Sequence, residues 1–400
     1  MNIEGQTGLY IHWPFCLAKC PYCDFNTHVH DHIDHQQWED AYLTSLEHYA
    51  ELLDGRIISS IFFGGGTPSL MRPETVGCVI DKVRCLWPCV NDPEITLEAN
   101  PTSVEAGKFK AFKEAGVNRV SIGVQALNDE DLQFLGRKHS VREALHAIDI
   151  AGELFDRFSF DLIYARSDQT PERWRDELKQ AITLARGHLS LYQLTIERNT
   201  PFHFDYAQGL FSLPDEAAGR KFYNMTQDIL EQGGLPGYEV SNHAASGHES
   251  RHNLTYWHYG DYIGIGPGAH GRLTMGGQKF ATREHHAPQI WLEHVRRSGC
   301  GAHPFTVIPS QERFLEALMM GLRLKKGVAV DHLSREGGRD WMSFIDYEKF
   351  SVAQNEGWIK SDEGFLSLTR EGTLRLNALI PYILKAADPQ APQDFQVQAV

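Results

Sequence analysis

Six short apolar runs rich in β-forming residues alternate with helical patterns over the first 200 residues, and this alternation limits the fold more than any other feature. Between the first two runs, Trp38, Tyr42 and Leu46 fall at helical spacing on one face. Apolar strands alternating with helices are typical of a parallel sheet that is buried on both faces. The sequence therefore predicts an α/β fold, either a doubly wound sheet or an incomplete barrel. The predicted strands are Gly8–Ile11, Ile57–Phe63, Ile95–Leu97, Arg119–Val124, Phe158–Ile163 and Leu189–Ile196.

In either arrangement, functional residues are expected at the carboxyl ends of the strands. Three cysteines follow the first run, and a glycine-rich stretch follows the second. Glu98 and Gln125 end the next two runs, and Asp161 lies within the fifth. We therefore expect these side chains to meet at one edge of the sheet.

The remaining sequence suggests four parts. Residues 1–233 hold the β-α units, and residues 234–304 form a connecting region rich in glycine, histidine and aromatic residues. In residues 305–385, predicted helices and a hairpin turning at Asp362-Glu363-Gly364 indicate a winged-helix-like module. The Pro-, Gln- and Ala-rich residues 386–400 are typical of a disordered tail. The predicted helices of the third part are Phe314–Leu324, Val330–Glu336 and Trp341–Glu356.

Three of the seven cysteines, Cys16, Cys20 and Cys23, fall within eight positions. Thiolates select zinc, Cu(I) or iron–sulfur clusters. A [4Fe–4S] cluster on three thiolates leaves one iron for a small-molecule ligand, which accounts for the number three. Zinc is the alternative, and it would need a fourth ligand such as His12 or His28. In a long chain with an odd number of cysteines, clustered thiols indicate metal chemistry in a reducing cytoplasm.

The C-x3-C-x2-C spacing, with Tyr22 before the last cysteine, resembles the radical S-adenosylmethionine (SAM) superfamily. The resemblance implies a partial (β/α)6 barrel and a [4Fe–4S] cluster whose free iron binds the amino and carboxylate groups of SAM. It also implies that the reduced cluster cleaves SAM to a 5′-deoxyadenosyl radical. An enclosed barrel mouth would protect such a radical from water.

The resemblance also implies which residues hold SAM. The glycine-rich stretch "FFGGGTPS" matches the segment that holds the amino group of SAM, and Arg137 would pair with a carboxylate. Asp161 would be costly in an apolar strand without a partner, and ribose hydroxyls would serve as one. Taken singly, such residues are more often turn or surface residues. The implied SAM-binding set is Tyr10, Tyr22, Gly65, Gly66, Thr67, Glu98, Gln125, Arg137 and Asp161.

The stretch "LYIHWPFCLAKCPYCDF" resembles the oxygen-independent coproporphyrinogen III oxidase-like family, and the likeness extends over nearly the whole chain. The oxidases of that family carry a further cysteine where this chain has Phe25, and they carry an N-terminal extension before the first strand. Both differences favour the branch of HemW-type haem chaperones, which bind haem and are thought to deliver it to acceptor proteins. Oxidative decarboxylation of coproporphyrinogen III in porphyrin biosynthesis is the alternative, so the sequence leaves enzyme activity open and identifies no catalytic residue.

The H-N-x-x-Y-W motif of that branch is present as His252, Asn253, Tyr256 and Trp257. Histidine can ligate haem iron, and Tyr and Trp offer flat faces for a porphyrin. The alternative interpretation is a packed aromatic segment around a hydrogen-bonded histidine, and the chain has 20 histidines from which an axial ligand could come. One departure from the family pattern is "ARSDQT", residues 165–170, where the family usually reads G-L-P-G-Q-T.

Charge and hydropathy bear on localisation and partners. The net charge of −14 disfavours nucleic acid as a partner, and the winged-helix-like part has 11 Lys and Arg against 11 Asp and Glu. A DNA-binding regulator with an iron–sulfur sensor is therefore disfavoured. No apolar run approaches the ~20 residues that span a bilayer, and no signal peptide is expected. The expected partners are haem, acceptor haemoproteins and an electron donor, and the sequence also allows a homodimer. The expected location is the cytoplasm.

Overall fold

A computed structural model describes residues 5–30 and 32–385. The chain divides into two compact units, with the boundary in the sequence between Ile308 and Pro309. The predicted boundaries at residues 233 and 304 stay predictions, and the predicted tail lies outside the described residues. Within the described ranges, no helix is long and apolar enough to cross a membrane.

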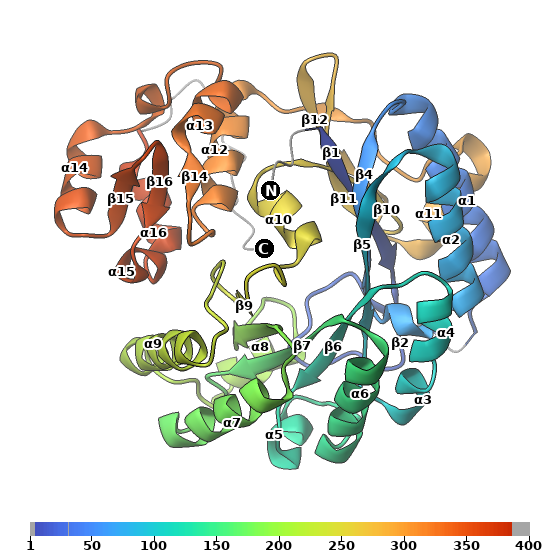
Figure 1. Cartoon of the computed structure of the whole chain (residues 1–400), viewed down its shortest axis with the longest axis horizontal. Helices are drawn as coiled ribbons and strands as arrows, with labels where there is room; N and C mark the ends of the chain where they lie inside the picture. Colours follow the sequence, from blue (N-terminus) through green and yellow to red (C-terminus); the bar gives the residue numbers. More distant parts are fainter. Residues whose placement is uncertain (1–4, 31, 386–400) are drawn as a thin grey trace. The chain divides into compact units, whose positions relative to one another are not determined.

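The first unit is built on one large sheet whose central strands are parallel (Figure 1). Six of these strands lie next to one another in chain order, so the β-α alternation produces the predicted partial (β/α)6 barrel. Each predicted run lies on one of them, although the last strand ends three residues before Ile196. The six strands are β1 (Gln6–Trp13), β4 (Ile57–Gly65), β5 (Cys89–Ala99), β6 (Arg119–Gln125), β7 (Arg157–Tyr164) and β8 (His188–Gln193).

Helices cover the outer face of these strands (Figure 1). Their apolar stripes pack on the buried strand residues and form one continuous core. Local sequence fixes where several helices begin: Ser140 and Glu143 form a capping box, and Thr170 caps the helix that starts at Pro171. The helices are α1 (His35–Leu52), α2 (Pro73–Leu86), α3 (Ser103–Ala106), α4 (Phe109–Glu114), α5 (Asp129–Phe134), α6 (Val141–Leu154) and α7 (Pro171–Leu184), with a 3-10 turn η1 at Pro68–Leu70.

Residues 234–304, expected to form a connecting region, add strands to both edges of the same sheet. One strand, β9 (Asn242–Ala244), pairs antiparallel with β8. At the other edge, β10 (Asp261–Ile265) pairs parallel with β1 and is followed by antiparallel neighbours. The other elements of this unit are β2 (Phe15–Cys16), β3 (His28–Val29), α8 (Pro201–Ala207), α9 (Glu216–Gln232), α10 (Arg251–Trp257), β11 (His270–Met275), β12 (Gln278–Arg283), α11 (Pro288–Ser298) and β13 (Thr306–Val307).

The second unit combines helices with a small antiparallel sheet of order β14-β16-β15. The predicted hairpin is present, and its turn places Glu363 and Gly364 at φ values of 47° and 80°, as a type I′ turn requires. The predicted helix Trp341–Glu356 is divided, because Asp346 caps a new helix there. The elements are α12 (Ser310–Gly321), β14 (Val328–Ala329), α13 (Val330–Gly337), η2 (Trp341–Phe344), α14 (Tyr347–Asn355), β15 (Ile359–Asp362), β16 (Phe365–Leu368), α15 (Arg370–Thr373) and α16 (Leu376–Ile383).

Candidate functional site

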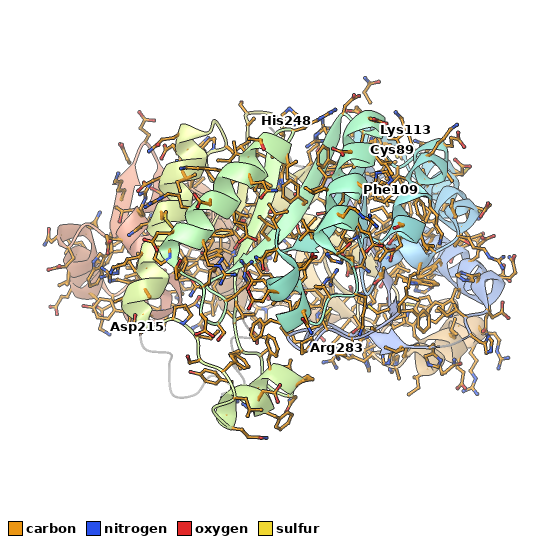
Figure 2. The ribbon with its side chains drawn as sticks, turned by 90° about the horizontal axis from the view of Figure 1, so that it is seen from below. Cys89, Phe109, Lys113, Asp215, His248 and Arg283 are labelled. Atoms are coloured by element: carbon orange, nitrogen blue, oxygen red, sulfur yellow. The ribbon has the colours of Figure 1, made fainter. Side chains whose placement is uncertain are left out.

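The carboxyl ends of the parallel strands define one edge of the first unit, which we call the carboxyl edge. In Figure 2, Cys89 at the start of β5 and Arg283 at the end of β12 lie at opposite ends of the sheet, and the carboxyl edge is the end near Arg283. Short helix α8, which follows β8, projects beyond this edge (Figure 2). The residues predicted from the sequence to bind the cluster and SAM are found at this edge or on the strands that lead to it.

Cys16, Cys20 and Cys23 lie on a loop that follows β1, which we call the cysteine loop (residues 14–27). All three are half-buried free thiols. A turn in which Cys23 N–H donates to the Cys20 carbonyl (3.1 Å) shapes the loop, and β2 pairs with β3 to close it. Burial raises the pKa of the Cys16 and Cys23 thiols, so it favours their protonated form.

Two side chains outside the cysteine loop donate hydrogen bonds to its sulfur atoms. Thr67 Oγ1 donates to Cys16 Sγ at 3.4 Å, and Arg137 Nη1 donates to Cys20 Sγ at 3.2 Å. Asn100 joins the two donors: its Nδ2 donates to Thr67 Oγ1 (3.2 Å), and its Oδ1 accepts from Arg137 Nη2 (2.5 Å). Sequence reasoning missed Asn100, although its position directly after β5 was the available signal.

The glycines after β4 are required by close contact between two backbones. A Cβ on Gly66 would lie 2.6 Å from the Phe15 carbonyl oxygen, and Gly65 has a φ of 108°. Gly65 N–H donates to Glu98 Oε2 (3.2 Å), and Gly66 N–H donates to the Trp13 carbonyl (2.7 Å). Both backbone donors are therefore used within the protein.

Glu98 on β5 and Asp161 on β7 bring two carboxyl groups to the inner face of the barrel. Burial raises the pKa of Glu98 to about 8, and the neighbouring charge of Asp161 adds to the rise. Burial also raises the pKa of Asp161 to about 6, and hydrogen bonds from Ser190 and Ser121 to the carboxyl group limit the rise. Asp161 Oδ1 is buried and has no hydrogen-bond partner among the described residues. Such an oxygen fits a ligand that brings hydroxyl donors, as ribose does.

The remaining predicted SAM residues also lie along this part of the unit. Tyr10 on β1 has its hydroxyl 3.0 Å from His12 Nδ1, and its ring stacks on Phe62. Tyr22 packs against Phe202 of α8. Gln125 ends β6 with a φ of 74°, where the pairing register with β7 shifts.

The zinc alternative finds no support in the histidines that it needs. His12 has both ring nitrogens hydrogen-bonded, to the Tyr10 hydroxyl and to the Asn26 carbonyl, each at 3.0 Å. His28 Nε2 lies 3.3 Å from Asn26 Oδ1. Over residues 5–30 and 32–385, no three His, Cys, Asp or Glu side chains are gathered so as to hold a single ion. A zinc ion that used His12 as its fourth ligand would require that ring to give up one of its two hydrogen bonds.

The four residues of the H-N-x-x-Y-W motif lie on α10, on the inner side of the sheet (Figure 1). His252 is buried, and its ring stacks on Phe62 with centroids 5.0 Å apart. Its Nδ1 is hydrogen-bonded to Ser60 Oγ (2.8 Å), and its Nε2 is hydrogen-bonded to the Tyr256 hydroxyl (2.6 Å). Burial lowers the pKa of His252 to about 3, so the ring is neutral. Both ring nitrogens are therefore occupied within the protein.

Two residues of the loop after β7 have the left-handed backbone conformation that glycine favours. Ala165 and Asp168, which stand where the pattern has glycine, both have a φ of 56°. Arg166 stands where the pattern has leucine, and it is buried. Its guanidinium pairs with Glu177 (2.5 Å) and Asp131 (2.9 Å). A buried ion-pair network thus holds the loop in a conformation that glycine would adopt more easily.

Comparison with known proteins places this geometry in a family. The sequence profile described as the radical SAM superfamily matches residues 10–181, and that of the HemN C-terminal domain matches residues 308–375. The chain therefore belongs to the radical SAM superfamily. Within it, the chain belongs to the family of the HemW haem chaperones, as its relatives over nearly the full length show.

Two relatives and one structure illustrate the similarity. The haem chaperone HemW of Escherichia coli K12 is 37% identical over 385 residues, covering 94% of this chain and 98% of HemW. The mitochondrial radical S-adenosyl methionine domain-containing protein 1 of Bos taurus is 36% identical over 386 residues, covering 95% and 87%. Coproporphyrinogen III oxidase (HemN) of E. coli, described as a radical SAM enzyme, matches with a TM-score of 0.78 over 94% of this chain and 89% of its own. Its sequence identity is 21%, so this match establishes the fold.

Proposed function

We propose that this protein is a haem chaperone, which binds haem and transfers it to acceptor haemoproteins with the help of a [4Fe–4S] cluster and SAM. The observation that carries the proposal is a sequence identity of 32–37%, over nearly the full length, to four proteins named haem chaperone HemW. The exposed Phe25 supports it, because the coproporphyrinogen oxidases carry a fourth cysteine at this position.

The cluster would be held by Cys16, Cys20 and Cys23, which lie on one loop and receive hydrogen bonds from Thr67 and Arg137. SAM would lie along the carboxyl edge. Gly65 and Gly66 would face its amino group, Arg137 its carboxylate, and Asp161 its ribose, with Tyr10, Tyr22, Glu98 and Gln125 around it. The unsatisfied Oδ1 of Asp161 supports this placement, because a bound hydroxyl group would complete it.

Haem would contact α10 through the motif residues His252, Asn253, Tyr256 and Trp257. The structure limits what His252 can contribute, because its Nε2 would reach haem iron only after releasing the Tyr256 hydroxyl. We therefore propose that this helix lines the haem site and that iron ligation through His252 is the less favoured arrangement.

An anaerobic experiment tests the function. The cluster is reconstituted with iron and sulfide, and the protein is offered haem or, separately, coproporphyrinogen III with SAM and a reductant. Stable haem binding, followed by transfer to an apo-haemoprotein and without formation of vinyl groups, is the expected result. Efficient conversion of coproporphyrinogen III would overturn the proposal and favour the oxidase. The Phe25→Cys variant is the matched control, since it restores the cysteine of the oxidases.

A cytoplasmic location, an electron donor and a homodimer complete the proposal. Seven free thiols, four of them outside the cysteine loop, support a reducing compartment. Cell fractionation would test the location, and light scattering at several protein concentrations would test the dimer.

A further inference from the structure

Asn100 connects the two side chains that donate hydrogen bonds to cysteine sulfur atoms. Its carboxamide donates to Thr67 Oγ1 and accepts from Arg137 Nη2. Thr67 and Arg137 in turn donate to Cys16 and Cys20. One uninterrupted chain of hydrogen bonds thus runs from one predicted cluster ligand to another through a single carboxamide.

The protein holds the Arg137 guanidinium through both Nη atoms, and the Tyr22 hydroxyl lies close to it. Nη1 donates to Cys20 Sγ, and Nη2 donates to Asn100 Oδ1 and to the Gly123 carbonyl (2.9 Å). Nε is buried and has no partner in the described part of the chain. A guanidinium that uses its Nη atoms on the protein and keeps Nε unpaired is oriented to receive an anionic group at Nε.

We propose that Asn100 is a positioning residue that sets both the reduction potential of the cluster and the affinity for SAM. This inference rests on the cluster and SAM site proposed above. Asn100 fixes the Thr67 hydroxyl and the Arg137 guanidinium, so both keep donating to cysteine sulfur while Arg137 Nε stays directed at the carboxylate of the methionine moiety. Hydrogen bonds to ligand sulfur stabilise the more negative, reduced cluster, and second-layer partners of this kind tune both potential and affinity.

A purely structural role for Asn100 is separable from this one. The backbone N–H of Asn100 donates to Glu105 Oε2 (3.0 Å), and this bond ties the loop after β5 to α3. A change of the Asn100 side chain leaves that bond in place. Variants at this position are therefore expected to fold.

The test uses Asn100→Ala, which removes the carboxamide, and Asn100→Leu, which removes its hydrogen bonds but keeps its volume. Asn118→Ala is the matched control, because the Asn118 carboxamide also joins two groups. These are the backbone Ile95 N–H and Pro93 carbonyl, at the opposite end of the strands. Reconstituted proteins are compared by redox titration followed by electron paramagnetic resonance (EPR), by the SAM dependence of the EPR signal, and by thermal unfolding without cofactors.

Both Asn100 variants are expected to shift the midpoint potential to a more negative value and to bind SAM about tenfold more weakly, as for other outer-layer partners of a metal site. Asn118→Ala is expected to lower the melting temperature and to leave potential and SAM affinity unchanged. A wild-type potential and SAM affinity in Asn100→Leu would show that the side chain only fills space and would overturn the inference. Wild-type protein that assembles no cluster would overturn the proposed function and this inference together.

Discussion

The carboxyl edge and helix α10 both bury polar side chains, and they differ in how fully these are satisfied. At the carboxyl edge, Asp161 Oδ1 and Arg137 Nε are buried without a partner among residues 5–30 and 32–385. On α10, both ring nitrogens of His252 are hydrogen-bonded. A buried polar group without a partner costs about 1–3 kcal/mol. We infer that the carboxyl edge is shaped for a ligand, whereas the His252 ring on α10 is satisfied within the protein.

The same contrast appears in the pKa values. Burial raises the pKa of Glu98 and Asp161, so two carboxyl groups at the carboxyl edge resist ionisation in the ligand-free protein. Burial lowers the pKa of His252, which keeps that ring neutral and suits its two hydrogen bonds. Substitutions at the carboxyl edge should therefore change ligand binding, and substitutions on α10 should first change stability.

The largest expected effect is the loss of the cluster. Cys20→Ala should hold less than about a tenth of the iron and sulfide of the wild-type protein after anaerobic reconstitution, because two thiolates do not retain the cluster. Cys85→Ala is the matched control, since Cys85 and Cys89 repeat the C-x3-C spacing but Cys85 is exposed on α2. Metal analysis measures both. Equal iron content in the two variants would contradict the assignment of the cysteine loop.

His252→Ala tests the inference that the His252 ring on α10 is satisfied within the protein. The variant leaves Ser60 and Tyr256 without their partner and opens a cavity beside Phe62, so it should lower the free energy of unfolding by about 3 kcal/mol. The Soret maximum of the haem complex should keep its wild-type position, because iron ligation through another residue is expected. Urea unfolding and absorption spectroscopy measure the two quantities. A variant with wild-type stability and a shifted Soret maximum would reverse our view of α10.

The pH dependence of the unfolding free energy tests the inference about the carboxyl edge. Carboxyl groups whose folded-state pKa is raised bind protons more tightly in the folded protein, so their ionisation destabilises it. The loss begins above the ordinary pKa near 4 and is complete above the folded-state pKa of about 8 for Glu98. Glu98→Gln should therefore remove about 3–4 kcal/mol of the fall in unfolding free energy between pH 4 and pH 8 in the ligand-free protein.

Urea unfolding across this pH range measures the effect. Glu51→Gln is the control, because Glu51 is exposed on α1. A pH profile of Glu98→Gln that overlays that of wild-type protein would show that Glu98 ionises freely at the carboxyl edge.

The sequence predicted the fold of the first unit well because its signals are local. Strand runs, capping boxes and glycine turns act over a few residues, and the six β-α units follow from them. It did not predict that residues 234–304 extend the sheet at both edges, since strand pairing such as that of β10 with β1 joins segments about 250 residues apart. Asn100 was missed for the same reason: its partners Thr67 and Arg137 are distant in sequence and meet only in the fold.

A substitution in the loop after β7 gives the smallest expected effect on the free energy of unfolding. Ala165 and Asp168 occupy the left-handed region at a cost of about 1 kcal/mol each relative to glycine. Ala165→Gly should therefore raise the free energy of unfolding by about 0.5–1 kcal/mol, allowing for the greater entropy of glycine in the unfolded chain. Ala185→Gly, at a φ of −74°, should lower it instead. Urea unfolding compares the two variants. A destabilising Ala165→Gly would show that contacts of the Ala165 methyl group fix the loop conformation. The inference that the ion pairs of Arg166 hold a strained backbone would then be wrong.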